Sequence, residues 1–335
     1  MKVAVIGAGS WGTAVAALAA HNEPTTLWAR RPELAADIRD RHLNTAYLPD
    51  VVLPERLHST SDLEEALDGA GVVVMGVPSH GFRDVLTDAH PHCPDGVPVV
   101  SLTKGVEQGT LARMTQVIAD VCPGHPAGVL SGPNLAKEVM AGYPAATVVA
   151  FEDDAIARTL QELFSTDAFR VYTNTDVIGC EVGGALKNVM AIAAGIADGM
   201  QFGDNTKAAL ITRGLAELAR LGISLGGEPL TFSGLAGMGD LIATCISPQS
   251  RNRHVGVELG KGRRLDEIID EMKMVAEGVK TSRAVVDLAA QHGVEMPIAE
   301  QVVAVLYEGK HAADLVPALM QRQQKAELHG IVAHQ

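Results

Sequence analysis

Aromatic residues are scarce in this chain of 335 residues, where Phe, Trp and Tyr together make up 4% of the sequence. Hydrophobic residues nevertheless account for 47%, so the cores must be built mostly from Ala, Val, Leu and Ile. A chain of this length is too long for one comfortable core, and we expect two domains. The 34 glycines lie beside apolar runs, which is typical of turns at strand ends in an α/β protein.

Cysteine is also rare. The four cysteines, Cys93, Cys122, Cys180 and Cys245, form no C-x-x-C motif and no close pair. This spacing fits neither a zinc site nor a disulfide framework, and it is typical of a reducing compartment. We therefore expect a cytoplasmic protein without a metal site.

Positive charge is in deficit, because 27 Lys and Arg residues stand against 40 Asp and Glu residues, for a net charge of −13. Such a surface repels nucleic acid and anionic lipid, which excludes two classes of partner. An anionic small substrate is not excluded, since the local charge of a cleft can oppose the overall balance.

Long uninterrupted apolar runs are missing as well. The run 189–197 is bounded by Lys187 and Asp198 and is too short to span a bilayer. The alanine-rich N-terminus superficially resembles a secretory signal, but cleavage after residue 20 would remove what reads as the first strand. The sequence therefore predicts no membrane insertion.

The first half of the chain alternates between strand-like apolar runs and helical patterns. We expect strands at 2–6, 25–29, 72–75, 97–102, 128–131, 145–151 and 169–172. A helix is expected at about 10–21, and a capping box, Ser61-x-x-Glu64, should open another short helix. Apolar strands separated by helices are typical of a parallel sheet covered on both faces.

After residue 173 only helical patterns follow, at about 176–199, 207–221, 251–259, 265–272, 281–292 and 297–307. The fold class predicted is α/β, with an N-terminal Rossmann-type doubly wound sheet and a C-terminal all-helical domain. We place the boundary near 172–178, which gives a dinucleotide-binding domain at 1–175 and a helical substrate and catalytic domain at 176–335.

A glycine-rich motif follows the first predicted strand. Residues 7–12, Gly-Ala-Gly-Ser-Trp-Gly, match G-x-G-x-x-G at a strand–turn–helix junction. Gly7 allows the tight turn, Gly9 lets the backbone approach a pyrophosphate, and Gly12 permits close helix–strand packing. The helix N-terminus offers N–H groups and a partial positive charge to phosphates. A purely structural turn is the alternative interpretation of this motif.

The end of the second predicted strand bears on the choice of cofactor. NAD sites place an acidic residue there to bind the ribose 2′-OH, whereas this chain has Arg30 and Arg31. Two guanidinium groups can pair with a 2′-phosphate instead. The sequence therefore predicts that NADP(H) is preferred and NAD(H) remains possible, with a solvated surface pair as the alternative.

Three ionisable residues fit the needs of hydride transfer to a ketone, which requires a proton donor and a positive charge beside the developing alkoxide. Lys104 follows a strand at the edge where α/β sheets bind ligands. Lys187 lies in an apolar helix, where burial would lower its pKa. Asp240 lies in a glycine-rich segment that reads as a turn. Taken singly, a solvated lysine and an aspartate that bonds its own turn are equally ordinary readings.

Several motifs together carry a family resemblance. They are residues 7–12, Leu-Thr-Lys-Gly at 102–105, Ser-Gly-Pro-Asn-Leu-Ala at 131–136, Gly-Ala-Leu-Lys-Asn at 184–188, Gly-Met-Gly-Asp at 237–240, Ser-Arg-Asn at 250–252 and Val-Ala-Glu-Gly at 275–278. Over nearly the whole chain, in order and spacing, this set closely resembles the bacterial NAD(P)-dependent glycerol-3-phosphate dehydrogenases.

The resemblance implies interconversion of dihydroxyacetone phosphate and sn-glycerol 3-phosphate, the backbone precursor of glycerophospholipids, by a homodimer. It makes Lys187 the proton acceptor and donor, beside Lys104 and Asp240. The positions implied to contact substrate are Lys104, Gly132, Asn134, Lys187, Asp240, Ser250, Arg251 and Asn252. The positions implied to bind the cofactor are Gly7, Gly9, Ser10, Trp11, Gly12, Arg30, Arg31, Lys104, Ala136, Arg251, Val275 and Glu277.

Two of these positions depart from common family forms. Trp11 replaces a frequent Tyr, and Asn134 stands where many members have Ser, which weakens that substrate assignment. The physical case for the phosphate site is that 250–252 begins a helix, where backbone N–H groups, a hydroxyl, an amide and a guanidinium can converge. An ordinary helix cap with an exposed arginine is the alternative.

Two other functions remain open. A 3-hydroxyacid dehydrogenase of the 6-phosphogluconate type shares the domain plan and the lysine, but its usual substrate carries a carboxylate. A non-catalytic NADPH-binding regulator would explain the glycine motif but not the grouping of Lys104, Lys187, Asp240 and Arg251.

Overall fold

The computed structural model describes residues 1–272, 276–327 and 329–331. Its contacts divide the chain into two compact units. The first unit consists of Met1–Thr103 and Ala112–Val177, and the second of Lys104–Leu111 and Ile178–Gln335. The second unit thus includes a short segment from the first half of the chain.

The first unit is built on an eight-stranded sheet in the order β10-β9-β8-β7-β6-β1-β2-β5. The strands are β1 (Lys2–Ile6), β2 (Thr25–Trp28), β5 (Leu57–Thr60), β6 (Ala70–Met75), β7 (Val99–Ser101), β8 (Ala127–Ser131), β9 (Ala145–Ala150) and β10 (Phe169–Asn174). The order runs outward in both directions from β1 and β6, which confirms the predicted doubly wound architecture and puts the switch point for ligand binding at these strands. The expectation of an all-parallel sheet is wrong at one pair, because β9 runs antiparallel to β8.

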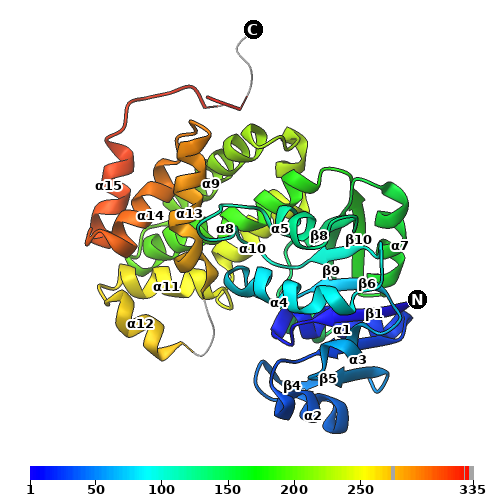
Figure 1. Ribbon diagram of the computed structural model, residues 1–335. Coiled ribbons are helices and arrows are strands. Elements are labelled where there is room, and N and C mark those ends of the chain that lie inside the picture. Colours follow the sequence, from blue (N-terminus) through cyan, green and yellow to red (C-terminus); the bar gives the residue numbers. More distant parts are fainter. Residues whose placement is uncertain (273–275, 328, 332–335) are drawn as a thin grey trace. The chain divides into compact units, whose positions relative to one another are not determined.

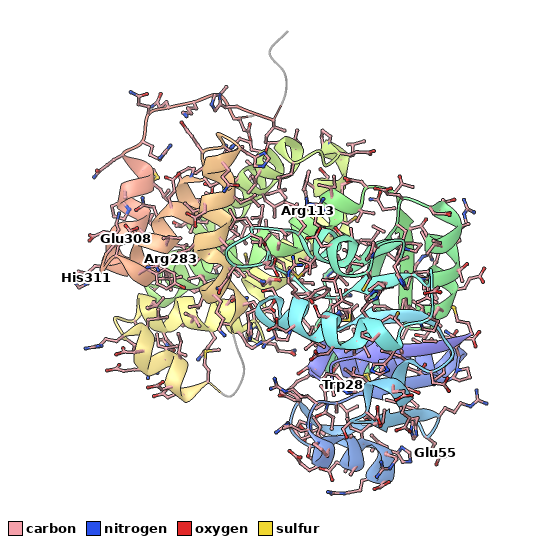
Figure 2. All side chains as sticks on the ribbon, in the orientation of Figure 1. Trp28, Glu55, Arg113, Arg283, Glu308 and His311 are labelled. Carbon is pink, nitrogen blue, oxygen red and sulfur yellow. The ribbon has the colours of Figure 1, made fainter. Side chains whose placement is uncertain are left out.

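Helices cover both faces of this sheet, as predicted (Figure 1). Val3 and Val5 of β1 share a core with α1 (Ser10–Asn22), α2 (Pro32–Arg41), α6 (Ala136–Met140) and α7 (Asp154–Phe164). Ala4 and Ile6 face the other way, toward α3 (Leu63–Leu67), α4 (Phe82–Ala89) and α5 (Met114–Val121). Alternate residues of one strand therefore supply two cores. Trp28 is buried in the second of them (Figure 2).

The capping box predicted from Ser61 is wrong by one residue. Asp62 is the N-cap of α3, and its carboxylate accepts hydrogen bonds from the backbone N–H groups of Glu64 and Glu65. The Glu65 side chain turns back to the Thr60 hydroxyl. A carboxylate is as good a cap as a serine hydroxyl, and here it starts the helix at Leu63.

Other short elements were not anticipated in the first unit. Besides β5 and several helices, they are the antiparallel pair β3 (Leu43–Asn44) and β4 (Leu48–Val52), and the 3₁₀ turns η1 (Ser79–Gly81) and η2 (His90–His92). The pair β3–β4 lies directly after α2 in the chain, and Tyr47 lies in the turn between its strands.

From Val177 onward every regular element among the described residues of the second unit is helical, which confirms the predicted all-helical half, whereas Lys104–Leu111 contains no helix. Its helices are α8 (Val177–Gly199), α9 (Asp204–Ser224), α10 (Asp240–Ile246), α11 (Arg251–Gly260), α12 (Leu265–Glu271), α13 (Glu277–Gln291), α14 (Pro297–Tyr307) and α15 (Leu315–Met320). Short turns are η3 (Pro229–Ser233), η4 (Leu235–Gly239) and η5 (Ala312–Asp314). The guanidinium of Arg283 on α13 lies 3.9 Å from the ring centre of Tyr307 on α14, which helps to fasten these two helices (Figure 2).

Helix α8 is the core of the second unit. In the described part of the chain it is the one helix long and apolar enough to cross a membrane, and 94% of its most apolar window is buried inside the protein. Leu186, Val189 and Ile192 belong to the large core cluster of this unit. Burial on all sides explains why this helix lacks a polar face.

Glycines bring α8 and α11 into direct backbone contact. A Cβ on Gly195 would lie 2.2 Å from the Arg253 carbonyl oxygen, and one on Gly256 would lie 2.1 Å from the Ile192 carbonyl oxygen. Gly199 and Gly260 repeat this arrangement one turn further along. The C-terminal part of α8 and the length of α11 are therefore held at a fixed separation, and both helices carry predicted site residues.

Candidate active site

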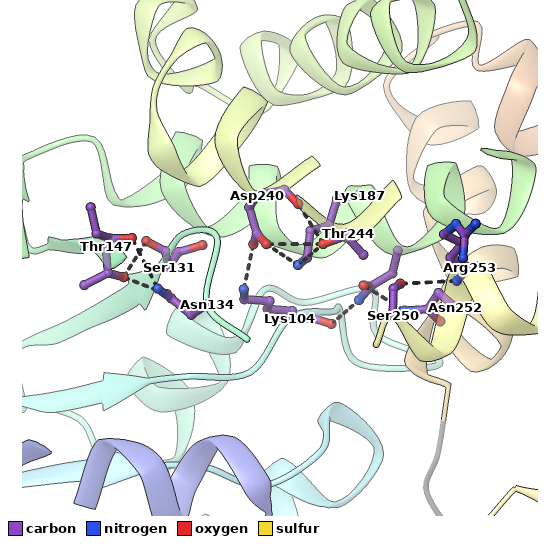
Figure 3. Close-up of polar contacts among 12 residues, drawn as sticks. Lys104, Ser131, Asn134, Thr147, Lys187, Asp240, Thr244, Ser250, Asn252 and Arg253 are labelled. Carbon is purple, nitrogen blue, oxygen red and sulfur yellow. Dashed lines mark hydrogen bonds and ion pairs between the residues drawn. The ribbon is translucent and has the colours of Figure 1, made fainter. Parts of the chain in front are cut away.

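Lys187 lies in the middle of α8, where only 6% of it is exposed. Its neighbours along the helix belong to the hydrophobic core, so its ammonium group depends on a few polar partners. The Nζ atom donates to Oδ1 of Asp240 and, at 2.6 Å, to the Thr244 hydroxyl (Figure 3). The predicted burial of this lysine is confirmed.

Asp240 receives a second lysine. Lys104 Nζ donates to Asp240 Oδ2 at 2.6 Å, and only 1% of Asp240 is exposed. Lys104 begins the segment Lys104–Leu111 that belongs to the second unit, so all three groups lie within one unit (Figure 3). The structure thus brings together Lys104, Lys187 and Asp240, the three residues that the sequence predicts to be catalytic.

The surroundings of Asp240 differ from the predicted turn. The glycine-rich stretch Leu235–Gly239 forms one π-helical turn, and Asp240 is the first residue of α10. Helical geometry was missed because the glycines 234, 237 and 239 read as a loop. Gly237 is needed here, since a Cβ at that position would lie 2.2 Å from the Phe232 carbonyl oxygen.

Burial shifts the proton affinity of Lys187. Loss of water around the ammonium group, aided by the charge of Lys104, lowers the pKa of Lys187 to about 7, although Asp240 opposes the shift. A group with such a pKa can gain and lose a proton near neutral pH, which is the property required of a general acid and base.

Thr244 is a site residue that the sequence interpretation missed. Its hydroxyl accepts the Lys187 hydrogen bond and donates to the backbone carbonyl of Asp240 at 2.6 Å. The spacing of four residues from Asp240 puts both side chains on one face of α10. That spacing could have pointed to Thr244 if a helix had been predicted there.

A chain of amides connects the lysines to the start of α11. The Asn252 amide donates to the Asn188 side-chain oxygen at 2.9 Å and accepts from the Gly278 backbone N–H, also at 2.9 Å. The Asn188 amide also donates to the backbone carbonyl of Lys104, at 3.4 Å. Both asparagines are buried. Asn188 is a second residue that the sequence interpretation missed.

The predicted phosphate cluster lies at the N-terminus of α11. Ser250 is the N-cap, and its hydroxyl accepts from the backbone N–H of Arg253 at 3.2 Å. Arg251 is the first residue of the helix and is exposed. The predicted helix start is therefore confirmed, while the role of these residues in binding a phosphate stays a prediction.

In the first unit, the glycine-rich loop has the geometry expected of a nucleotide-binding turn. Gly7 has φ +118°, and a Cβ there would lie 2.6 Å from the Gly76 carbonyl oxygen. A Cβ on Gly12 would lie 2.1 Å from the Gly7 carbonyl oxygen. Gly9 has no neighbour within 4 Å of such a Cβ, so protein packing does not require this glycine and an approaching ligand can explain it.

The two arginines after β2 lie at the start of α2. Arg31 is its N-cap residue, and its guanidinium carbon lies 5.7 Å from the ring centre of Tyr47. Both Arg30 and Arg31 are exposed. Together, the glycine-rich loop and the two arginines fit a dinucleotide with a 2′-phosphate. The first unit provides the open side of Gly9, the N-terminus of α1 and two cations.

The remaining predicted contacts in the first unit follow β8. The Asn134 amide donates to the Ala146 carbonyl at 3.2 Å and accepts from the Thr147 hydroxyl at 2.9 Å (Figure 3). Its polar atoms thus bind strand β9. A Cβ on Gly132 would lie 3.1 Å from the Cα of Thr147, and Ala136 begins α6.

Two predicted cofactor residues lie near the start of α13. Glu277 is the first residue of that helix, whereas Val275 lies outside the described residues. Across the residues that were searched, which are the described ones, no group of His, Cys, Asp and Glu side chains could hold a metal ion.

Comparison with known proteins shows the family. The model for the NAD-dependent glycerol-3-phosphate dehydrogenase N-terminus matches residues 2–157, and the model for the C-terminus of the same family matches residues 176–317. This chain belongs to the NAD-dependent glycerol-3-phosphate dehydrogenase family. The family predicted from the sequence is confirmed, and the 6-phosphogluconate-type alternative is not favoured.

Individual relatives in the family cover nearly the whole chain. A glycerol-3-phosphate dehydrogenase [NAD(P)+] of Sphingopyxis alaskensis is 55% identical over 98% of this chain and 99% of its own length. One of Mycobacterium avium is 52% identical over 98% and 97%. The crystal structure of glycerol-3-phosphate dehydrogenase from Coxiella burnetii is similar with a TM-score of 0.92, at 38% identity over 96% of this chain and 99% of that one.

Proposed function

We propose that this protein is an NAD(P)-dependent sn-glycerol-3-phosphate dehydrogenase that reduces dihydroxyacetone phosphate to sn-glycerol 3-phosphate. One observation carries the proposal beyond family membership: the buried carboxylate of Asp240 lies between the ammonium groups of Lys104 and Lys187. A carbonyl that becomes an alkoxide needs this combination of positive charge and an exchangeable proton. A non-catalytic NADPH-binding regulator would have no use for it.

Each member of this cluster then has a role. Bound NAD(P)H supplies the hydride. Lys187 gives a proton to the developing alkoxide and takes it back in the reverse direction, since its pKa of about 7 allows both. Lys104 adds positive charge beside the same oxygen. Asp240 holds both ammonium groups in place and can orient a substrate hydroxyl, while Thr244 fixes the direction of the Lys187 N–H groups.

Further residues are assigned to substrate and cofactor in the same proposal. Ser250, Arg251 and Asn252 bind the substrate phosphate, with Gly132 and Asn134 as additional contacts. The cofactor is bound by Gly7, Gly9, Ser10, Trp11, Gly12, Arg30, Arg31, Lys104, Ala136, Arg251, Val275 and Glu277. Arg30 and Arg31 give a preference for NADP(H) over NAD(H), because no acidic residue stands at the end of β2 to receive a ribose 2′-OH.

The wider assignment follows from the same family. Residues 1–175 serve as the dinucleotide-binding domain and residues 176–335 as the substrate domain. The enzyme works in the cytoplasm, and its product supplies the backbone of glycerophospholipids.

The proposal is tested by following NADPH oxidation with dihydroxyacetone phosphate, beside parallel assays of NADH oxidation with the same substrate and of NADP+ reduction with 3-hydroxyacids. We expect turnover with dihydroxyacetone phosphate and none with 3-hydroxyacids. Lys187→Met should bind NADPH normally and turn over about 100- to 10,000-fold more slowly. Turnover only with a 3-hydroxyacid, or no turnover at all, would overturn the proposed reaction.

Arg251→Ala provides a separate test of the phosphate site. This variant should chiefly raise the KM for dihydroxyacetone phosphate, because the guanidinium binds a group that does not react. An unchanged KM would remove Arg251 from the substrate site while leaving the proposed reaction intact.

We also propose that the enzyme is a homodimer and that η3, η4 and α10 provide its interface. Leu230, Met238, Ile242 and Ile246 are 84%, 38%, 39% and 53% exposed, and the last three recur every four residues along one stripe. Residues 229–250 contain no Lys, Arg, His or Glu and a single Asp, Asp240, which is buried. A neutral apolar face adds no local repulsion between two chains of net charge −13, and residues 229–250 offer no basic side chain to an anionic membrane.

Light scattering after size-exclusion chromatography tests this interface. The wild-type protein should have twice the mass of one chain, and Ile242→Glu with Ile246→Glu should reduce it to one. Ile269→Glu on α12, which replaces an exposed isoleucine outside this stripe, should remain dimeric. A dimer that survives the double substitution would place the interface elsewhere.

A further inference from the structure

A buried asparagine connects the turn between β3 and β4 to the glycine-rich loop. Asn44 has no exposed surface. Its amide donates to the Ala8 carbonyl at 2.9 Å and to the Thr13 hydroxyl at 2.8 Å, and its oxygen accepts from the Tyr47 backbone N–H at 3.0 Å. Because both donors and the acceptor are satisfied, this side chain has little freedom to move.

Tyr47 is connected to the same loop a second time. The Ser10 hydroxyl donates to the Tyr47 backbone carbonyl at 3.1 Å. Ser10 is the first residue of α1 and directly follows Gly9, the glycine whose open side suggests a ligand. Both backbone polar groups of Tyr47 are therefore fixed, directly or through Asn44, to the segment predicted to bind the pyrophosphate.

The Tyr47 ring provides a platform for Arg31. The ring is partly buried and packs against the core beneath α1 and α2, and the Arg31 guanidinium carbon lies 5.7 Å from its centre. At this distance a cation and an aromatic face attract each other. A carboxylate oxygen of Glu33 lies 3.9 Å from the Nε atom of Arg31, and such a long and exposed ion pair contributes little.

We propose that Tyr47 is a specificity-determining residue for the cofactor, because it holds Arg31 in position for the adenosine 2′-phosphate. This inference rests on the proposed preference for NADP(H). An exposed arginine normally loses side-chain freedom when it binds. The ring restricts Arg31 in advance, and Asn44 fixes the ring relative to the loop that binds the shared part of the cofactor. Tyr47 therefore acts on NADPH and leaves NADH, which lacks this phosphate, almost unaffected.

The test is a double-mutant cycle on the ratio of kcat/KM for NADPH to that for NADH. Arg31→Ala should lower this ratio about tenfold or more, as expected for the loss of a charge-assisted bond. Tyr47→Ala should lower it about three- to fivefold, and Tyr47→Phe, which keeps the ring, should leave it unchanged. In the Arg31→Ala background, Tyr47→Ala should have almost no further effect on the ratio.

Two further results separate specificity from a structural role. Tyr143→Ala, which removes an exposed tyrosine elsewhere in the first unit, should leave the ratio at its wild-type value. If Tyr47→Ala only disturbs folding, both cofactors will weaken equally and the ratio will stay constant, which would overturn the inference.

The outcomes also distinguish this inference from the proposed preference. If Arg31→Ala lowers the ratio and Tyr47→Ala does not, the preference stands and the role of Tyr47 is wrong. If Arg31→Ala leaves the ratio unchanged, Arg31 does not bind the 2′-phosphate, and the inference about Tyr47 is wrong with it.

Discussion

A lysine buried as deeply as Lys187 would be costly to keep charged without partners. Its partners are one carboxylate and one hydroxyl, and it shares the carboxylate with Lys104. When both lysines are protonated, the cluster of Lys104, Lys187 and Asp240 therefore has an excess of one positive charge. An oxyanion formed from the substrate would neutralise this excess, so the arrangement favours the transition state over the empty site.

The pKa of Lys187 predicts opposite pH profiles for the two directions of the reaction. Ketone reduction needs the protonated lysine, so its kcat/KM should fall as the pH rises through about 7. Alcohol oxidation needs the neutral lysine, so its kcat/KM should rise through the same pH. Steady-state rates measured from pH 5.5 to 9.5 in both directions would show this mirror relation. Profiles that move together would contradict it.

Lys104→Met is the matched variant for this pH dependence. The positive charge of Lys104 helps to lower the pKa of Lys187, so its removal should move both limbs to higher pH as well as slow the reaction. Limbs that stay in place, at whatever rate, would show that burial alone sets the pKa.

At the residue scale the sequence predicted the charged members of the lysine–aspartate cluster and missed two neutral residues that contact it, Thr244 and Asn188. Lys104, Lys187 and Asp240 were accessible because each lies in a distinctive motif. Thr244 was missed because its relation to Asp240 depends on a helix that the glycines conceal. Asn188 was missed because its partner, Asn252, is 64 residues away in sequence, and nothing in the intervening residues records that contact.

Among the elements, prediction succeeded where apolar periodicity is strong. The observed α14 has the expected limits, and α8 begins one residue later than expected. The direction of strands and the short strands outside the main sheet were harder to predict. The antiparallel orientation of β9 to β8 leaves no mark on its composition, because β9 is as apolar as β6, which is parallel to both of its neighbours. The strand β4 contains Pro49 and Asp50, which both have low strand propensity, and yet it pairs with β3.

The glycine contact between α8 and α11 predicts a large effect of a single methyl group. Gly256→Ala would put a Cβ within 2.1 Å of the Ile192 carbonyl oxygen, so the helices must separate. We expect the free energy of unfolding to fall by at least about 2 kcal/mol, with a loss of activity because Lys187 and Arg251 lie on the separated helices. Urea unfolding and the kcat of the same sample would measure both effects.

Gly203→Ala is the control for that substitution. Gly203 precedes α9 in the same unit, has no neighbour within 4 Å of an added Cβ, and has an ordinary φ of −70°. This variant should unfold within about 1 kcal/mol of wild type. A similar loss in both variants would mean that glycine content, and not the helix contact, sets the stability.

The buried Glu217 on α9 predicts a pH dependence of stability. Its carboxylate accepts from the backbone N–H groups of Ile298 and Ala299 at the start of α14, and burial raises its pKa from 4.5 to about 7. Between these two values the folded state keeps a proton that the unfolded state releases. The free energy of unfolding should therefore fall by up to about 3 kcal/mol as the pH rises through this window.

Glu217→Gln cannot titrate, so its stability should lack this contribution to the slope. Urea unfolding of both proteins at pH 5.5, 6.5 and 7.5 would measure the difference. Parallel slopes would assign the pH dependence to other groups.

For the whole molecule, the sequence predicted two domain types and their order, but not the membership of residues 104–111. This segment has no periodicity of its own and follows a strand of the first unit, so the sequence alone would assign it to that unit. Its long-range contacts group it with the second unit instead. One of them is the hydrogen bond that the Gln108 amide donates to the Lys280 carbonyl at 2.7 Å.

The core clusters predict two unfolding transitions. One cluster lies entirely in the second unit, and the two clusters that flank the sheet lie in the first. Both tryptophans, Trp11 and Trp28, belong to the first unit. Tryptophan fluorescence should therefore report the first unit alone, and circular dichroism at 222 nm should report both. We expect Gly256→Ala to lower the midpoint seen by circular dichroism and to leave the fluorescence midpoint unchanged. Coincident shifts would mean that the units unfold as one.

The path of the chain also has a consequence for recombination between relatives and for the design of hybrid enzymes. Because Lys104–Leu111 is grouped with the second unit, a cut or crossover at the apparent boundary near Val177 separates Lys104 from Lys187 and Asp240. A hybrid that joins the first half of one relative to the second half of another therefore combines proposed catalytic groups from two parents. Such a hybrid can succeed only where the borrowed 104–111 segment suits its new host, so the two halves of this enzyme are not exchangeable modules.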